Sequence, residues 1–432
     1  MWANESVFYQ IYPIGFCGAP LENDGQTVSR ILKVKEWSDY LKEVGFNAIY
    51  FSPIFESDNH GYDTRDYRKI DCRLGTNEDF AEVCKDLHEK EIKVVLDGVF
   101  NHVGRGFWAF QDVLKNRESS KYKDWFYINF GQNNAYNDGL YYEGWEGHYE
   151  LVKLNLRNRE VVEHLFACIK GWVEEFDIDG LRLDVAYMID REFLRELRAY
   201  CNNLKPEFFL IGETIHGDYN QIVNDDMLHS CTNYECYKGV YSSLNSKNMF
   251  EIAYSLNRQF GPENWTIYKG KHLVSFVDNH DVTRLASILS DKRHLNAAYA
   301  LIFAMPGIPC VYYGSEWGVE GRKEDGDASL RPCIEKPEAN ELTEFIKKLA
   351  EIRKDNKALA YGGYKNIVLT NLQLVFERYL EGETVYVGIN IDDKDFKANF
   401  SWKNDAVDLL TGEEVDLSSG VNLPPFSVAI WK

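Results

Sequence analysis

Four segments of the sequence place charged side chains directly after a short apolar run. They are Asp97–His102, Gly180–Ala186, Gly212–His216 and Phe276–Asp281. A single acidic residue in such a position is usually a cap or a turn residue. Several together are costly, because like charges repel one another unless a function or a metal requires them. The four segments therefore indicate a site for acid–base or nucleophilic chemistry.

Arg182, Asp184 and Glu213 are the best placed of these side chains for such chemistry. Side chains two positions apart on a strand share a face, so Arg182 and Asp184 are expected to point the same way. A guanidinium beside Asp184 would keep that carboxylate ionised, as a nucleophile requires. Glu213 follows the apolar run Phe208–Ile211, and an apolar setting favours the protonated form that a general acid needs. Two carboxyl groups about 5–5.5 Å apart would suit hydrolysis of a glycosidic bond with retention.

The elements that would position these residues alternate between strand-like and helix-like segments up to about residue 355. Eight short runs are apolar on both faces, as strands covered by helices are: Val7–Tyr12, Ala48–Pro53, Val94–Phe100, Gly180–Val185, Phe208–Glu213, Cys231–Tyr234, Val274–Asn279 and Pro309–Tyr313. Apolar residues three and four apart predict helices over Arg30–Val44, Asn77–Lys90 (with Thr76 as its N-cap), Glu160–Phe176, Arg191–Leu204, Lys247–Phe260, Leu295–Met305 and Glu341–Lys354. About eight βα units in series predict an α/β fold, a (β/α)8 TIM barrel, whose chemistry is carried at the C-terminal ends of its parallel strands.

Two regions interrupt this alternation. Residues 104–156, after the third strand, are rich in aromatic side chains, which predict either a small core of their own or a wall on which sugar rings stack. These residues are Phe107, Trp108, Phe110, Trp125, Phe126, Tyr127, Phe130, Tyr136, Tyr141, Tyr142, Trp145 and Tyr149. Near the C-terminus, an antiparallel β-sandwich is predicted by strand-like runs over Val368–Tyr379, Thr384–Ile391, Phe396–Trp402, Ala406–Leu410 and Phe426–Trp431. We therefore expect a barrel from residues 1–103 and 157–357, an inserted subdomain over 104–156 and a C-terminal sandwich over 358–432.

The composition excludes several classes of protein. The chain has 432 residues, 45% of them hydrophobic, and a formal net charge of −20. That charge would repel nucleic acid and anionic membranes, and no stretch approaches the roughly 20 apolar residues of a membrane span. The sequence starts without the basic and apolar regions of a secretory signal, and its nine cysteines contain no Cys-x-x-Cys pair. We therefore expect reduced thiols and a cytoplasmic protein.

Seven segments, taken in order along nearly the whole chain, resemble the α-amylase family of glycoside hydrolases. They are Gln10–Pro13, Gly61–Asp63, Asp97–His102, Gly180–Ala186, Gly212–Glu213, Phe276–Asp281 and Gly307–Glu316. The resemblance implies that Asp184 is the nucleophile and forms a covalent glycosyl intermediate. It implies that Glu213 protonates the leaving oxygen and then activates water, and that Asp278 binds sugar hydroxyls and stabilises the transition state.

The resemblance also implies a set of substrate-binding residues. They are Tyr62, His102, Arg182, His280, Asp327 and Arg331. The first four would surround the sugar at the nucleophile, where the arginine orients the nucleophile, the histidines form hydrogen bonds and the tyrosine stacks. Asp327 and Arg331, four positions apart, match a family element that grips the next sugar. A plain surface ion pair is the alternative interpretation of these two residues.

Two motifs resemble the neopullulanase, cyclodextrinase and maltogenic amylase group of this family. Glu213–His216 has a histidine three residues after the acid, and Leu151–Asn155 is similar to the group's Met-Pro-Lys-Leu-Asn but lacks its first two residues. The similarity implies hydrolysis of α-1,4-glucosidic bonds in maltooligosaccharides and maltodextrins, with cyclodextrins or pullulan as further candidates. The long N-terminal domain that this group uses for dimerisation is missing from the sequence, so the oligomeric state stays open.

The same comparison of motifs bears on cofactors. Relatives that bind calcium commonly carry Lys-His shortly after the nucleophile, where this chain has Tyr187 and Met188. Asn101 matches an asparagine of that calcium site. Further oxygen atoms could come from Asp112, Asp124 and Asp138. No loop has the spacing of a calcium site, so we expect no required cofactor, with Asn101 as a weak calcium candidate.

Three other functions stay open at this stage. The covalent intermediate could pass to a sugar hydroxyl, which would make the protein a 4-α-glucanotransferase or a trehalose-forming isomerase. A phosphosugar hydrolase or a sucrose phosphorylase would need a cationic pocket, and the nearby candidates Arg322-Lys323 and Lys292–His294 are more simply explained as solvated loop charges. The third is a catalytically silent, glycan-binding barrel, although such a protein typically lacks one of the carboxylates that this chain keeps.

Overall fold

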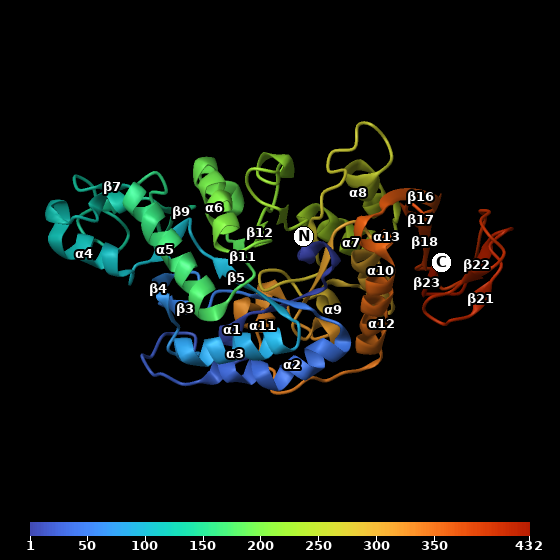
Figure 1. Ribbon diagram of the computed structural model, residues 1–432, viewed down its shortest axis with the longest axis horizontal. Helices are drawn as coiled ribbons and strands as arrows, with labels where there is room; N and C mark the ends of the chain where they lie inside the picture. The colour runs from blue at the N-terminus through green and yellow to red at the C-terminus, as the bar shows by residue number, and fades with distance from the viewer.

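A barrel of eight parallel strands forms the centre of the computed structural model, which describes all residues from 1 to 432 (Figure 1). In chain order the strands are β1 (Phe8–Ile11), β2 (Ala48–Phe51), β5 (Lys93–Gly98), β11 (Gly180–Leu183), β12 (Phe209–Gly212), β13 (Ser230–Cys231), β14 (Val274–Ser275) and β15 (Ile308–Tyr312). Consecutive strands pair side by side from β1 to β13, and β14 pairs with β15, which returns to β1. A single bridge between Thr232 and Val274 joins β13 to β14. The predicted (β/α)8 barrel is confirmed.

Helices cover the outside of the barrel. The longer ones are α2 (Lys33–Val44), α3 (Asn77–Glu89), α5 (Arg159–Phe176), α6 (Arg191–Leu204), α7 (Tyr234–Ser246), α8 (Phe250–Phe260), α10 (Leu295–Ala304) and α12 (Glu341–Asp355). Short helices are α1 (Pro13–Phe16), α9 (Leu285–Ile288) and α11 (Asp327–Leu330). Thr76 caps α3 as predicted, because its side chain accepts a hydrogen bond from the Asp79 N–H. None of the helices combines the length and the apolar character that crossing a membrane requires.

The sixth βα unit differs from its prediction. The strand ends at Cys231, and α7 begins at Tyr234, because the Asn233 side chain accepts a hydrogen bond from the Cys236 N–H and caps the helix. No helix is predicted from the sequence at this position. Lys247 then ends α7 in a left-handed conformation (φ 53°), so the predicted start of the next helix at Lys247 is too early.

Side chains fill the interior of the barrel. They come from Phe8, Ala48, Tyr50, Val95, Phe209, Ile211, Val274, Phe276, Ile308 and Cys310. Trp2 packs against the N-terminal end of the barrel, with its ring 5.8 Å from that of Phe8 and 5.7 Å from that of Phe209. A filled interior leaves the C-terminal ends of the strands as the place for a site.

The segment after the third barrel strand forms an inserted lobe (residues 104–156), at the left of Figure 1. Its elements, with the strand that leads into it, are β6 (His102–Gly104), α4 (Trp108–Asn116), β7 (Ile128–Asn129), β8 (Tyr141–Tyr142), β9 (Gly144–Trp145) and β10 (His148–Lys153). Strands β6, β10 and β9 form an antiparallel sheet. Many of the aromatic residues are buried and belong to the same large hydrophobic cluster as the barrel and its helices, among them Phe107, Phe110, Trp125, Phe126 and Tyr142. A second hairpin, of β3 (Phe55–Ser57) and β4 (Thr64–Ile70), follows the second barrel strand and contacts the lobe.

The C-terminal part is antiparallel, as predicted. After α13 (Lys357–Tyr361), a four-stranded sheet contains β16 (Gly363–Leu369), β17 (Gln373–Leu380), β18 (Glu383–Asn390) and β23 (Ser427–Trp431). Smaller pairs join β19 (Phe396–Ala398) to β22 (Val421–Leu423) and β20 (Ala406–Val407) to β21 (Glu414–Val415). The predicted single run Val368–Tyr379 is wrong, because a turn at Thr370 divides it into two strands. The division into residues 1–103 with 157–357, 104–156 and 358–432 stays a prediction.

Candidate active site

Strands β11 and β12 bring Asp184 and Glu213 together. Leu183 and Gly212 are partners in the parallel pairing, and Asp184 and Glu213 follow them directly. The Glu213 N–H donates to the Leu183 carbonyl at 2.9 Å, and the Glu213 carbonyl accepts from the Ala186 N–H at 3.0 Å. Because neighbouring strands lie about 4.8 Å apart, the two carboxyl groups start from adjacent positions on the barrel rim.

Arg182 is the centre of the buried cluster that these two residues belong to. Its Nη1 lies 2.9 Å from Asp184 Oδ1 and 2.9 Å from Asp97 Oδ2, and its Nη2 lies 3.1 Å from Glu213 Oε1. Asp97 comes from β5, the neighbour of β11, at the position paired with Arg182. The expectation that Arg182 and Asp184 point the same way is confirmed.

The charges of this cluster shift its protonation. Burial raises the pKa of Asp184 well above its usual value, Arg182 lowers it in part, and the charges of Glu213 and Asp97 raise it again. Burial likewise raises the pKa of Asp97 against the opposing effect of Arg182. The predicted influence of Arg182 on Asp184 is therefore present, but burial outweighs it. Asp184 and Asp97 therefore hold a proton to higher pH than isolated carboxyl groups would.

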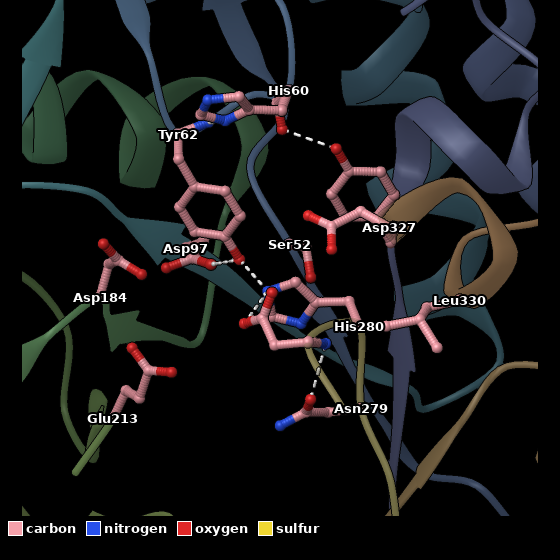
Figure 2. Close-up of polar contacts among 12 residues, drawn as sticks. Ser52, His60, Tyr62, Asp97, Asp184, Glu213, Asn279, His280, Asp327 and Leu330 are labelled. Atoms are coloured by element: carbon pink, nitrogen blue, oxygen red, sulfur yellow. Dashed lines mark hydrogen bonds and ion pairs between the residues drawn. The ribbon is translucent and has the colours of Figure 1, made fainter. Parts of the chain in front are cut away.

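Tyr62 and His280 form a wall beside this cluster (Figure 2). Their rings stack with centroids 5.5 Å apart and 7° between the planes. The Tyr62 hydroxyl contacts His280 Nε2 and donates to Asp97 Oδ2 at 3.2 Å. Gln10 fixes the other edge of the imidazole, because its Nε2 lies 2.8 Å from His280 Nδ1. Figure 2 shows Asp97 between this wall and Asp184, so the predicted residues meet in one place.

Asp278 has other hydrogen-bond partners than the Arg182 cluster, and its catalytic role stays a prediction. Its Oδ2 accepts hydrogen bonds from the Leu285 N–H at 2.7 Å and from the Ser315 hydroxyl at 2.8 Å. Asp278 thus connects the start of α9 to the segment after β15. The physical reason is that β14 ends at Ser275, and beyond a strand end the alternation of side chains no longer tells which way a residue points.

Asp281, at the end of the same segment, is a further carboxylate beside Asp97, Asp184 and Glu213. Its Oδ2 lies 3.0 Å from His280 Nε2 and its Oδ1 lies 2.9 Å from Arg331 Nη2. Burial raises the pKa of Asp281, but His280 and Arg331 outweigh that effect and hold the pKa below its usual value. Its negative charge contributes in turn to the raised pKa of Asp184. The sequence singles out the segment Phe276–Asp281, and of its two distal aspartates Asp281 is the one with an ion pair to Arg331 and a contact to His280.

His102 lies beside Asp184, with its Nε2 3.9 Å from Asp184 Oδ2. Burial lowers the pKa of His102 to about 3, so the imidazole is neutral. Its Nδ1 lies 3.1 Å from Asn101 Nδ2, whereas its buried Nε2 has no hydrogen-bond partner. Such an atom next to a carboxylate suits a hydrogen bond to a substrate hydroxyl.

Asp327 and Arg331 form the predicted ion pair, with Arg331 Nη2 3.1 Å from Asp327 Oδ2. The Arg331 side chain is only 9% exposed, whereas that of Asp327 is 47% exposed and also contacts Lys323. Arg331 Nε also donates to the His280 carbonyl at 3.0 Å. Arg331 therefore belongs to the site and Asp327 lies at its rim, so the pair is more than an isolated surface contact.

Comparison with known proteins agrees with this geometry. The family described as the catalytic domain of alpha amylase matches residues 10–357. The chain belongs to the α-amylase family. Cyclomaltodextrinase from Thermoanaerobacter pseudethanolicus is 31% identical over 91% of this chain and 71% of its own length. Neopullulanase 2 from Thermoactinomyces vulgaris is 32% identical over 100% of this chain and 78% of its own length.

A solved structure extends the likeness to the whole chain. The cyclic α-maltosyl-(1→6)-maltose hydrolase from Arthrobacter globiformis matches with a TM-score of 0.85 and 27% identity, over 99% of both chains. The protein is therefore an enzyme, a glycoside hydrolase of the α-amylase type. The family resemblance that the motifs carry is confirmed.

Two aromatic residues of this α-amylase-family site have no assigned role in the sequence-based prediction. Tyr187 lies 5.4 Å from His216, ring to ring, and burial raises its pKa to about 12, with added contributions from the charges of Glu146 and Glu213. Trp145 of the inserted lobe lies 6.1 Å from His102. The aromatic density of the lobe is the one signal in the sequence that points to a residue such as Trp145.

The side chains named with Asn101 as calcium candidates have the following contacts. The Asn101 amide contacts His102, Asp112 accepts hydrogen bonds from an asparagine and a serine, and Asp138 pairs with Arg105 at 3.0 Å. The carboxylates of Asp112 and Asp138 thus have protein partners, whereas the contact of Asn101 involves its amide nitrogen and not the oxygen that would bind calcium. The absence of a required cofactor stays a prediction.

Proposed function

We propose that this enzyme hydrolyses α-1,4-glucosidic bonds in maltooligosaccharides and maltodextrins, with cyclodextrins as further substrates, by double displacement with retention. The observation that carries the proposal is that Asp184 and Glu213 face the same buried Arg182 from neighbouring barrel strands. Adjacent strands are about 4.8 Å apart, and retaining glycosidases hold their two carboxyl groups about 5–5.5 Å apart. The spacing of the strands therefore supports a retaining mechanism, in which one carboxylate is the nucleophile, over an inverting mechanism, which needs a wider gap for a water molecule.

In the first step, a carboxylate oxygen of Asp184 attacks the anomeric carbon and forms the glycosyl–enzyme bond. Glu213 gives its proton to the glycosidic oxygen, so the leaving sugar departs with a free hydroxyl. In the second step, ionised Glu213 takes a proton from water, whose oxygen attacks the anomeric carbon and releases Asp184. Arg182 contacts both carboxyl groups and orients them through the two steps.

Positive charge develops on the sugar ring in both transition states. We assign the role of stabilising that charge to Asp281, in place of Asp278, because Asp281 is held ionised beside the cluster. The unpartnered Nε2 of His102 is assigned to a sugar hydroxyl on the side of Asp184. Tyr62, already stacked on His280, is assigned as the platform for the apolar face of the same sugar.

The substrate class is supported by the relatives and by the charges near the site. The names of the relatives, cyclomaltodextrinase and neopullulanase, refer to enzymes of α-glucans. A phosphorylated sugar finds no free cation here, because Arg331 is paired with Asp281 and Arg322 with Glu324. A neutral α-glucan needs no such cation, so the charges near the site are compatible with it.

Timed product analysis on maltotriose tests the proposal. We expect glucose and maltose as the only products, released first as the α-anomer in NMR spectra. Products longer than maltotriose would instead show transfer to a sugar hydroxyl, and initial release of the β-anomer would contradict retention. Asp184→Asn is the control, and we expect it to lower the rate by several orders of magnitude while sugar binding is kept.

A cytoplasmic location is a further part of the proposal. All nine cysteines are free thiols, and eight of them are buried. Unpaired thiols are typical of proteins from a reducing compartment. Cell fractionation with an antibody against the chain would test the location.

A further inference from the structure

Gln10 of strand β1 is a buried polar residue that no step of the proposed mechanism uses. Its side chain is only 3% exposed. Because alternate side chains of a strand share a face, Gln10 points into the barrel as Phe8 does, two positions earlier. A buried amide is costly unless it forms hydrogen bonds, and Gln10 forms them with Ser52 and His280.

Two neighbouring strands hold this amide in place. Gln10 Nε2 donates to the Ser52 hydroxyl oxygen at 3.1 Å and lies 2.8 Å from His280 Nδ1. Ser52 directly follows β2, the neighbour of β1, and is fully buried. A primary amide carries two N–H groups, so one nitrogen can donate to both partners. The amide nitrogen of Gln10 is therefore fixed against Nδ1 of the imidazole.

The opposite edge of the imidazole faces hydrogen-bond acceptors. Asp281 Oδ2 lies 3.0 Å from His280 Nε2, and an ionised carboxylate only accepts hydrogen bonds. The Tyr62 hydroxyl contacts the same nitrogen and gives its own proton to Asp97, so it too is an acceptor for Nε2 (Figure 2). Nε2 therefore carries a hydrogen atom. In a neutral imidazole the other nitrogen then has a free lone pair, which is what the Gln10 N–H needs.

The charged groups that face His280 act in opposite directions. Two carboxylates attract a second proton to the imidazole, and two guanidinium groups oppose it. Two tyrosine hydroxyls stay uncharged, because burial raises the pKa of both. These groups are Asp97 and Asp281, Arg182 and Arg331, and Tyr12 and Tyr62. The charges alone therefore do not decide how many protons His280 carries.

Gln10 adds a contact that distinguishes the two protonation states of His280. In the neutral ring, Nδ1 accepts a hydrogen bond from Gln10 Nε2, which is its one hydrogen-bond partner in the protein. In the imidazolium, Nδ1 would carry a hydrogen atom and two donors would face each other 2.8 Å apart. The lost hydrogen bond leaves two buried donors without an acceptor, which is costly. The contact therefore favours the neutral ring.

We propose that Gln10 is a positioning residue that keeps His280 neutral, with its hydrogen atom on Nε2, and so leaves the negative charge of Asp281 available to the sugar ring. The inference rests on the proposed function, in which Asp281 stabilises the positive charge of the transition state. An imidazolium would neutralise Asp281, which Arg331 already contacts at 2.9 Å. Gln10 acts through His280 and does not touch the reacting atoms.

NMR spectra of the unaltered protein, labelled with nitrogen-15 in its histidines, test the position of the proton directly. The chain has ten histidines, and His280→Gln identifies the signals of His280 by their loss. At about pH 7.5 we expect a hydrogen atom on Nε2 and none on Nδ1. A hydrogen atom on Nδ1, whether the ring is neutral or charged, overturns the proposal.

Gln10→Glu replaces the donor with an acceptor of the same length. The introduced carboxylate can accept from Nδ1, so at about pH 7.5 we expect both ring nitrogens to carry hydrogen and kcat on maltotriose to fall about tenfold. Since the ring loses its second proton as the pH rises, the ratio of kcat for the variant to kcat for the parent should increase towards about pH 9. Gln373→Glu makes the same change at a glutamine of the C-terminal sheet that is 4% exposed, and its ratio should not depend on pH.

Three results with Gln10→Glu overturn the role of Gln10. They are an unchanged kcat in a variant whose His280 carries both protons, a loss of kcat that is the same at all pH values, and an equal pH dependence in Gln373→Glu. If Gln10→Glu does not fold, the spectrum of the unaltered protein decides alone. If the unaltered enzyme does not cleave maltotriose, the proposed function is overturned instead, and the same spectrum still decides whether Gln10 holds His280 neutral.

Discussion

The backbone N–H of Val185 donates a hydrogen bond of 3.0 Å to Oε2 of Glu213. Val185 reaches this position with a left-handed backbone (φ 41°), a conformation that costs a β-branched residue about 1–3 kcal/mol. Val185 directly follows Asp184, so the turn that ends β11 directs the Val185 N–H towards the side chain of Glu213. Together with Arg182 on Oε1, this amide fixes both carboxyl oxygens of Glu213.

Glu213→Gln should separate the role of proton donor from the role of structural partner. The amide oxygen that this change introduces can still accept from Val185, so the fold should persist. We expect kcat on maltotriose to fall about 10²–10⁴-fold, because the leaving sugar no longer receives a proton. Hydrolysis of a maltosyl fluoride, whose leaving group needs little protonation, should fall much less. Equal losses on the two substrates would contradict the assignment of Glu213 as the general acid.

Asp281→Asn and Asp278→Asn make the same substitution at two positions three residues apart, of which Asp278 is buried and Asp281 is partly exposed. We expect Asp281→Asn to lower kcat about 10²–10³-fold, since it removes a negative charge next to the developing positive charge. Asp278→Asn keeps an acceptor for the Leu285 N–H and should leave kcat within about threefold. Steady-state kinetics on maltotriose, with thermal midpoints as a check on folding, decides between them. The reverse order of effects would restore Asp278 as the catalytic residue.

The barrel and the Asp184–Glu213 pair could be predicted from the sequence because strands that are apolar on both faces form short, recognisable runs of apolar residues. The pair follows such strands directly, so the alternation of side chains still applies to it. Asp278 and Asp281 lie three and six residues beyond Ser275, the end of β14, where no periodicity relates sequence to direction. Only the three-dimensional contacts distinguish these two aspartates.

Helix α7 shows a different limit. Its buried face includes Cys236, Val240 and Leu244, four residues apart, but tyrosines and serines occupy much of the rest. That face becomes visible in the sequence only once the N-cap at Asn233 is recognised.

Removal of divalent metal ions should leave the enzyme unchanged. The carboxylates of Asp112 and Asp138 already have protein partners, so we expect no calcium ion to be needed to hold the inserted lobe. Dialysis against a chelator should therefore change neither kcat on maltotriose nor the thermal midpoint. A loss that added calcium restores, and added magnesium does not, would contradict this expectation.

Glu316 should make the folded protein less stable as the pH rises towards 7. Burial raises the pKa of Glu316 to about 7, although hydrogen bonds from Tyr9 and Tyr40 lower it in part. Between about pH 4.5 and pH 7 the unfolded chain loses this proton while the folded chain keeps it, so stability falls as pH rises. The contribution amounts to roughly 3 kcal/mol, from about 1.36 kcal/mol for each pKa unit.

Glu316→Gln removes this titration and should therefore change the pH profile more than the fold. Its amide oxygen can accept from the Tyr9 hydroxyl, so we expect the variant to be no more stable than the parent at pH 5. At pH 8 the parent carries the cost of a buried charge and the variant does not, so the thermal midpoint of the variant should rise relative to the parent. Calorimetry at pH 5 and pH 8 measures both differences, with Glu324→Gln, an exposed position, as the control. A midpoint difference that is the same at both pH values would show that Glu316 does not titrate in this range.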